Sequence, residues 1–320
     1  MKKPRPFEKG ENVVAYASYL AHTLFEGVTR DTGLPYTTQH LGQTATMVEG
    51  VTCPSDYQKT AVAATWLHDS AEDIKGLDVF NPFKEPKRKR GTFYLNDLMA
   101  KAGEEGEAVC FIVDLMTNRE FGRIYPIIGG YFGYVYNIFD IPNDSARPLH
   151  ILGGCVKMSD RRMNINPDER MNVNNLVEEY QSLKGAGEKA LIKFYKRTKT
   201  IDAFIKKGSM DFDVGLFVET INNNFMQKQR SAAVDNLSLY VPLAEQKLLI
   251  EIGENSGLFQ FRRLRDVMKD ISLESIKLYK GDIHEIRDLG LNKGIPPVPG
   301  YTRILKEIRT EIAQGKHALH

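Results

Sequence analysis

A stretch of small and apolar residues that runs directly into a cluster of ionisable ones constrains this chain most. Residues 61–73 read AVAATWLHDSAED. At about 3.6 residues per helical turn, Glu72 lies one turn after His68 and Asp73 one turn after Asp69, so all four side chains can gather on one side of a helix. The apolar lead-in predicts a buried N-terminal part, which would hold the cluster in a fixed place. Crowded ionisable groups are costly unless a cation neutralises them; the alternative is an amphipathic helix with a solvated polar side.

Helical periodicity dominates the rest of the chain. Apolar residues recur at helical spacing in most segments, whereas strand-like alternation is scarce. The sequence therefore predicts an all-α fold, a helical bundle with inserts and a C-terminal helical extension. The segments expected to be helical are residues 12–27, 40–50, 59–74, 101–116, 149–164, 174–204, 245–254 and 300–314.

The composition is that of a globular protein with room for a substantial core. The chain has 320 residues, of which 42% are hydrophobic, and a formal net charge of +2. This near-neutral balance gives no overall reason to expect a nucleic-acid partner. No apolar run approaches the roughly 18 residues of a membrane span, and the three cysteines have neither disulfide-framework nor zinc-site spacing. We therefore expect a cytoplasmic protein without a membrane partner.

Insert-like regions interrupt the predicted bundle near residues 76–100, 119–148 and 185–235. The first contains helix-breaking prolines and the basic run KRKR at residues 87–90. The plain interpretation of that run is a solvated loop, and the functional one is a contact to a polyphosphate or to RNA. The second region is rich in glycine and tyrosine; we expect a partly buried connection or a contact between copies of the chain in a homo-oligomer, with a lid over the site as the alternative.

A metal site on the His68–Asp69 pair needs further ligands from elsewhere in the chain. Upstream, the candidates are His22 and His40, of which His40 follows a turn-like segment that leads into a helix. Downstream, the candidate is Asp160. Mixed imidazole and carboxylate ligation with open positions suits a hydrolytic Mn²⁺, Fe²⁺ or Zn²⁺ site, and the carboxylates favour Mn²⁺.

The helix predicted around Asp160 carries a set of polar side chains suited to a phosphate ester. Lys157, Asp160, Arg161 and Asn164 follow one another at three- and four-residue spacings, which places them on a shared face. Cations and an amide beside a carboxylate fit a metal-bound phosphate ester better than they fit a core.

The chain resembles a known family in the order of these residues. His40, then His68 and Asp69, then Asp160 is similar to the H…HD…D order of the HD-domain metal-dependent phosphohydrolases. Within them it resembles, as a distant member, the hydrolase domain of the RelA/SpoT type, which removes the 3′-pyrophosphate from (p)ppGpp. The motifs that carry the resemblance are TRDTGLPY at residues 29–36, WLHDSAED at 66–73, IVDLMT at 112–117, VKMSDRRMN at 156–164 and LSLYVPLAEQ at 237–246.

The resemblance implies a role for each candidate residue. The metal ligands would be His40, His68, Asp69 and Asp160, holding one divalent ion, Mn²⁺ in that family, with Fe²⁺, Zn²⁺ and Mg²⁺ as alternatives. The catalytic pair that orients and deprotonates a water would be Glu72 and Asp73. The residues on the nucleotide substrate would be Arg30 against the guanine ring, Asn164 in a hydrogen bond, Arg161 on phosphate or on Asp160, and Lys157.

The predicted domain organisation is an HD-type metallohydrolase domain over residues 1–255 and a C-terminal helical extension over 256–320. The extension is too short for the synthetase domain of long family members. The expected activity is removal of the 3′-pyrophosphate of (p)ppGpp. The alternatives are hydrolysis of another nucleotide, such as a nucleoside phosphate or a cyclic nucleotide, or a non-catalytic scaffold that binds nucleotides, or RNA through the extension. Residues 165–167, which read INP, depart from the family pattern and bear on the choice of nucleotide.

Overall fold

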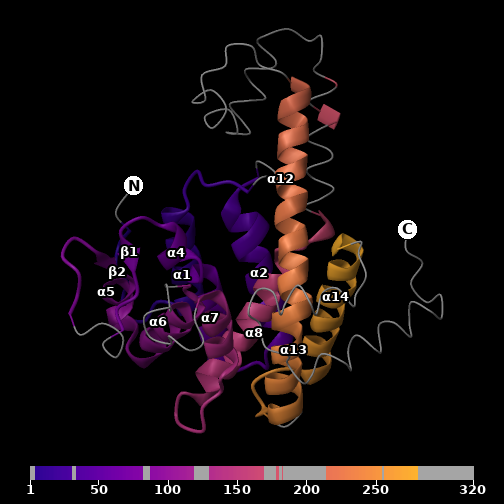
Figure 1. Cartoon of the computed structure of the whole chain (residues 1–320). Helices are drawn as coiled ribbons and strands as arrows, with labels where there is room; N and C mark the ends of the chain where they lie inside the picture. Colours follow the sequence, from indigo (N-terminus) through magenta and orange to yellow (C-terminus); the bar gives the residue numbers. More distant parts are fainter. Residues whose placement is uncertain are drawn as a thin grey trace.

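Helices form nearly all of the regular structure in this computed structural model, which describes residues 4–30, 34–81, 87–118, 130–168, 178–179, 182, 214–253 and 256–279 (Figure 1). The prediction of an all-α fold is confirmed. The α-helices are α1 (Val13–Leu24), α2 (Gln43–Val51), α3 (Asp56–Leu67), α4 (Ser70–Asp73), α5 (Leu95–Met99), α6 (Glu104–Met116), α7 (Gly130–Phe139), α8 (Arg147–Met163), α12 (Val214–Asp235), α13 (Val241–Ala244) and α14 (Phe261–Tyr279). Other elements are π-helical turns at Thr37–Gly42, Asn236–Tyr240 and Glu245–Ile252, a 3₁₀ turn at Ala100–Ala102, and the two-residue strands β1 (Leu77–Asp78) and β2 (Phe93–Tyr94).

Helix α3 lies at the centre of the N-terminal half and is surrounded by α1, α2, α6 and α8. Its small side chains Ala61, Ala63 and Ala64 are fully buried, which lets the neighbouring helices approach closely on several sides. The Ser55 hydroxyl begins the helix by accepting a hydrogen bond from the Gln58 N–H. The buried lead-in predicted before the His68–Asp69 pair is therefore present.

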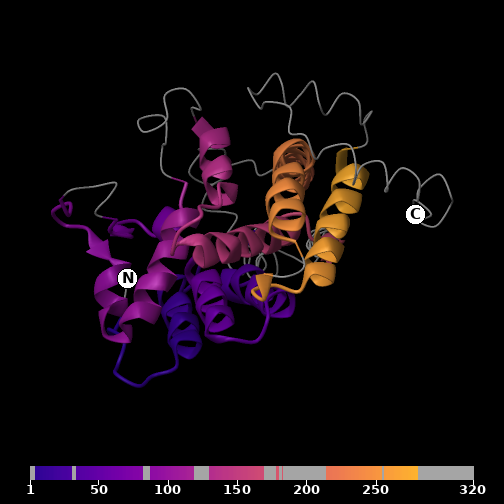
Figure 2. The ribbon, with the colours of Figure 1, turned by 90° about the horizontal axis from the view of Figure 1, so that it is seen from below.

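Helix α8 connects the two halves of the bundle. It is buried along most of its length and packs on α2, α6 and α7 on one side and on α14 on the other. Viewed from below, α12 and α14 stand side by side across α8 from the N-terminal helices (Figure 2). Leu264, Met268 and Ile271 of α14 are fully buried in the same apolar core. The proposed division of the chain at residue 255 stays a prediction.

The insert-like regions differ in what they contribute. Residues 76–100 contain the β1–β2 pair and α5, and Arg88 of the basic run lies over the Phe80 and Tyr94 rings and pairs with Asp97 at 2.6 Å. At least one of these arginines is thus committed to local packing. Helix α7, in the Gly- and Tyr-rich region, packs on α8.

Several predicted features lie outside the described residues: residues 119–129, most of 169–213, and 280–320 with the helix expected at 300–314. The RNA contact of the extension and the homo-oligomer stay predictions. Among the helices that the structure describes, none combines the length and the apolar character needed to cross a membrane.

Replacing Gly106 with alanine is expected to lower the free energy of unfolding by about 1–3 kcal/mol. A Cβ at this position in α6 would lie 2.5 Å from the backbone oxygen of Met99, which cannot turn aside as a flexible side chain can. Gly50 in α2 is the matched control, because its nearest neighbour, Arg263 Nη1, would lie 3.7 Å from the new Cβ. There alanine should add about 0.5–1 kcal/mol through its helix propensity. Urea unfolding measures both variants. Equal free energies of unfolding for Gly106→Ala and Gly50→Ala would show that Met99 does not restrict position 106.

Candidate metal centre

The His68–Asp69 pair sits in a break between two helices. Helix α3 ends at Leu67, and α4 begins at Ser70, so the pair occupies the turn between them. The prediction of one continuous helix over residues 59–74 is wrong at this point. The physical reason is local, because the Ser70 hydroxyl donates to the Leu67 carbonyl at 2.6 Å and His68 Nδ1 bonds the Thr65 carbonyl at 2.7 Å. Such side-chain bonds to the backbone compete with the helical ladder.

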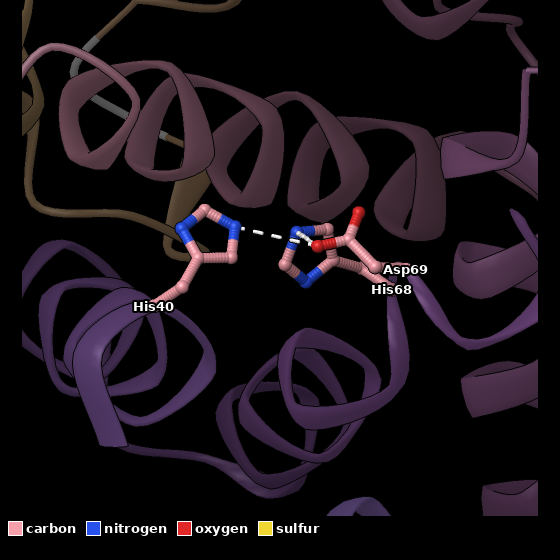
Figure 3. Close-up of side chains that lie close together, drawn as sticks. All are labelled: His40, His68 and Asp69. Carbon is pink, nitrogen blue, oxygen red and sulfur yellow. Dashed lines mark ion pairs between the residues drawn. The ribbon is translucent and has the colours of Figure 1, made fainter. Parts of the chain in front are cut away.

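Three segments far apart in the sequence bring the predicted ligands together. His40 comes from the π-helical turn Thr37–Gly42, His68 and Asp69 from the α3–α4 turn, and Asp160 from α8. Asp69 Oδ2 lies 3.3 Å from His40 Nε2 and 3.1 Å from His68 Nε2, and the three side chains point toward one another (Figure 3). Asp160 Oδ1 lies 3.3 Å from His40 Nε2 and 3.7 Å from His68 Nε2.

The other upstream candidate, His22, is not part of this group. It is exposed on α1, where its Nδ1 bonds the Ser18 carbonyl at 2.8 Å.

The chemistry of this group suits a metal ion. Atoms bound to one ion at about 2.1 Å lie roughly 3–4 Å apart, which matches the spacings just given. His68 Nδ1 donates to the Thr65 carbonyl, so Nε2 is the ring nitrogen directed into the group, and it becomes a ligand when a metal ion displaces its proton. That buried Nε2 makes no hydrogen bond within the described structure. The group of His40, His68 and Asp69 could therefore hold a metal ion, with Asp160 beside it.

The charges around the group counteract the effect of burial on the pKa values of its members. Burial alone raises the pKa of Asp69 and of Asp160, but the neighbouring cationic groups outweigh it, and both pKa values fall well below the usual range. For Asp160 the strongest of these is Lys157, whose Nζ lies 3.0 Å from Oδ2. Burial lowers the pKa of His68, but the two carboxylates outweigh it and raise that pKa well above its usual value. The site therefore attracts positive charge, as a cation-binding site must.

Two of the predicted substrate residues contact Asp160 itself. Lys157 is buried, and its ammonium also lies over the Tyr134 and Tyr240 rings, at 5.5 and 5.7 Å from their centres. The Asn164 amide donates to Asp160 Oδ1 at 2.8 Å. Both residues position this carboxylate in the structure, and their contact with a substrate stays a prediction.

Glu72 and Asp73 lie on α4, immediately beside the group. The side chain of Glu72 is exposed as a whole, but its carboxyl accepts a hydrogen bond from the Asn118 N–H. Partial burial of the carboxyl raises the pKa of Glu72, while the Asn118 N–H and the Lys157 charge oppose the rise. Partial burial, assisted by the Asp69 charge, also raises the pKa of Asp73. Their catalytic role stays a prediction.

A cavity of about 500 Å³ adjoins the group. Two residues that line the cavity also bond candidate ligands. The Tyr36 hydroxyl donates to Asp69 Oδ2 at 2.5 Å, and the Asn164 amide donates to Asp160 Oδ1. Arg30 lies over the Tyr36 ring at 5.7 Å. The lining residues are Val28, Thr29, Arg30, Tyr36, Asp73, Arg161, Asn164, Phe225, Lys228, Gln229 and Ala232.

Arg161 lines this cavity but is anchored to the helices behind it. Its Nε donates to the Asn236 side chain at 2.7 Å, and its Nη2 donates to the Ala232 carbonyl at 3.0 Å. The guanidinium also lies 4.5 Å from the centre of the Tyr240 ring. These contacts fix Arg161 in the cavity wall, and its pairing with phosphate stays a prediction.

Sequence reasoning missed the contribution of α12. Phe225, Lys228 and Gln229 line the cavity from this helix, yet no spacing or motif marks them in the sequence. It also assigned no role to Tyr36, although the residue belongs to the TRDTGLPY motif. That motif was the only signal that could have identified it.

Replacing Tyr36 with phenylalanine is expected to weaken metal binding by about tenfold, the lower end of the range for losing an outer-shell partner. The change removes the hydroxyl that donates to Asp69 but keeps the ring, which stacks on Phe25 at 5.2 Å. Tyr57→Phe, at a residue with 45% exposure, is the control. Calorimetric titration with Mn²⁺ measures both, and an unchanged affinity in the Tyr36 variant would show that the hydroxyl does not orient Asp69.

Comparisons of the chain with protein-family models, with curated proteins and with solved structures find no match.

Proposed function

We propose that the chain is a divalent-metal-dependent phosphohydrolase of a phosphorylated nucleotide, and that its substrate is (p)ppGpp. One observation carries the proposal: the cavity of about 500 Å³ shares Tyr36 and Asn164 with the His/Asp group. A ligand in that cavity would lie next to a bound metal. The H…HD…D order and the motifs shared with the RelA/SpoT-type hydrolase domain support the same activity.

The cavity lining suits a ligand with an anionic group and a planar body. Arg30, Arg161 and Lys228 bring positive charge to its walls. Its volume lies within the range of about 300–1,000 Å³ that is usual for small-molecule sites. Guanidinium groups bind phosphate and stack on rings, and both interactions are available to a nucleotide.

The proposed reaction is hydrolysis of a phosphate ester. When bound, Mn²⁺ would polarise a phosphoryl oxygen and help to ionise a water. Glu72, whose Oε1 already accepts from the Asn118 N–H, would orient that water and accept its proton. The water oxygen forms a bond to the phosphorus on the ribose 3′-oxygen as the P–O3′ bond breaks. The 3′-oxygen takes up a proton, and the products are GDP or GTP and pyrophosphate.

A second candidate keeps the chemistry but changes the nucleotide. Ile165 is fully buried, and Asn166 donates to Gln43 Oε1 at 3.3 Å. This segment, which departs from the family pattern, is therefore committed to packing, and neither residue belongs to the cavity lining. A nucleoside phosphate or a cyclic nucleotide is the alternative substrate.

A release assay tests the proposal. Purified protein with Mn²⁺ is incubated with ppGpp, pppGpp, nucleoside mono-, di- and triphosphates and cyclic nucleotides, beside an Asp69→Ala control. Pyrophosphate from ppGpp and pppGpp alone, absent in the control, is the expected result. Release from other nucleotides would support the second candidate. No release from any compound by a protein that binds Mn²⁺ would overturn the hydrolase proposal.

A further inference from the structure

Gln229 on α12 lines the cavity, and its side-chain amide is buried without a partner in the described part of the chain. The residue lines the cavity wall and is only 2% exposed. Neither its Nε2 nor its Oε1 has a hydrogen-bond partner in the described part of the chain. An unpaired buried donor or acceptor typically costs about 1–3 kcal/mol. At a cavity wall such a group can be paired by what occupies the cavity, an ordered water or a ligand.

The other buried side-chain amides that the structure describes are satisfied. Asn236 accepts from Arg161 and donates to Ser275 Oγ at 3.2 Å. Asn166 donates to Gln43 and accepts from the Asp168 N–H at 3.1 Å. Among the three buried amides that the structure describes, Gln229 is therefore the one whose donor and acceptor both lack a partner.

Phe225 lies one helical turn before Gln229 and lines the same cavity. Its side chain is 5% exposed. An apolar ring next to an amide that both donates and accepts matches the two parts of a nucleobase, which has a flat face and an edge with adjacent donor and acceptor groups. A phosphate or a sugar has no flat face of this kind.

We infer that Phe225 and Gln229 recognise the base of the substrate, with the Gln229 amide paired to a donor–acceptor edge and the Phe225 ring against the base. This inference rests on the proposed function and deepens it, since it names the part of the protein that reads the nucleotide. Every nucleobase has an adjacent donor and acceptor, so the pair selects for a base and leaves the choice among bases to the rest of the cavity. The base lies on the α12 side, and the phosphates extend toward the His/Asp group.

Calorimetric binding of the four nucleoside 5′-monophosphates and of ribose 5-phosphate, which lacks the base, tests this inference. The proteins are the full chain, Gln229→Met and Gln227→Met. Methionine keeps the length of glutamine without its amide, and Gln227 is exposed on the same helix. We expect at least one monophosphate to bind the unmodified chain more tightly than ribose 5-phosphate does. Gln229→Met should weaken that binding by about tenfold or more, as expected for two lost hydrogen bonds.

The remaining results distinguish a role of Gln229 in base recognition from a role of Gln229 in folding. Gln229→Met should bind ribose 5-phosphate as the unmodified chain does, and its melting temperature should be equal or higher because an unpaired buried amide is gone. Gln227→Met should change nothing. Base-independent binding by the unmodified chain, full nucleotide affinity in Gln229→Met, or an equal loss for both ligands with a lower melting temperature would each overturn the inference.

Failure of this inference is distinguishable from failure of the proposed function. If Gln229→Met hydrolyses ppGpp and keeps full nucleotide affinity, base recognition by Gln229 is rejected and the proposed hydrolase activity is unaffected. Base-dependent binding that requires Gln229, without hydrolysis of any compound, would discard the hydrolase and leave a nucleotide-binding cavity.

Discussion

Replacing Asp69 with alanine is expected to abolish stoichiometric metal binding and to reduce hydrolysis to background. Asp69 Oδ2 is the atom that both imidazoles approach, at 3.1 and 3.3 Å. Loss of an outer-shell partner alone typically costs about 10–100-fold in metal affinity, so loss of this carboxylate should cost more than about 100-fold. Metal content after dialysis and calorimetric titration with Mn²⁺ measure the effect.

The matched control for this variant is Asp266→Ala, at an exposed aspartate on α14. It should bind metal and turn over substrate as the unmodified chain does. Thermal unfolding without metal checks that Asp69→Ala still folds. An Asp69 variant that is folded, loaded with Mn²⁺ and fully active would remove the proposed centre.

Replacing Glu72 with glutamine is expected to reduce turnover by about 10²–10⁴-fold, the usual contribution of a general base. Metal affinity and KM should remain close to those of the unmodified chain, because Glu72 is not among the grouped ligands. The glutamine carbonyl can still accept from the Asn118 N–H, so the local structure should persist. Initial rates across substrate concentration separate kcat from KM.

Glu49→Gln, at an exposed glutamate on α2, is the control for the loss of a surface charge. It should leave the rate unchanged. If Glu72→Gln retains full turnover, Glu72 does not accept the proton, and Asp73, which lines the cavity on the same short helix, becomes the candidate base.

The sequence predicts the all-α fold because helical periodicity follows from residue type and spacing. It also proposes His40, His68 and Asp69, which the structure brings together in a group that could hold a metal ion; metal binding stays a prediction. Helical periodicity identifies α1, α6 and α8 to within three residues, and α3 at its start but not at its end. Side-chain chemistry alone leaves His22 and His40 open as upstream ligands, and the resemblance to the H…HD…D order favours His40 together with the distant Asp160. The structure places both within 4 Å of the His68 and Asp69 region, at His40 Nε2–Asp69 Oδ2 3.3 Å and His68 Nε2–Asp160 Oδ1 3.7 Å.

The break between α3 and α4 could not be read from periodicity. Residues 65–73 keep a helical pattern, and the chain leaves the helix because Ser70 and His68 bond backbone carbonyls of the preceding turn. A serine hydroxyl can bond a carbonyl of the preceding turn in any helix, so the residue type alone does not mark the point where the helix ends. The His68–Asp69 pair consequently faces the site from a turn and not from one side of a helix.

The α12 wall of the cavity depends on long-range packing. Phe225 and Gln229 reach the cavity because α12 packs on α14 and on the Asn236–Tyr240 turn, and because Arg161 of α8 donates to the Ala232 carbonyl of α12. No local pattern encodes that contact. Lys157 is a different case, because its three-residue spacing from Asp160 allowed either a substrate contact or a pair within the helix, and the structure shows the pair at 3.0 Å.

The most direct test of the metal centre is an anomalous difference map from a crystal grown with Mn²⁺. We predict one strong peak about 2.0–2.3 Å from His40 Nε2, His68 Nε2 and the nearest carboxylate oxygens of Asp69 and Asp160. The absence of a peak among these four side chains, with Mn²⁺ bound elsewhere on the chain, would contradict it.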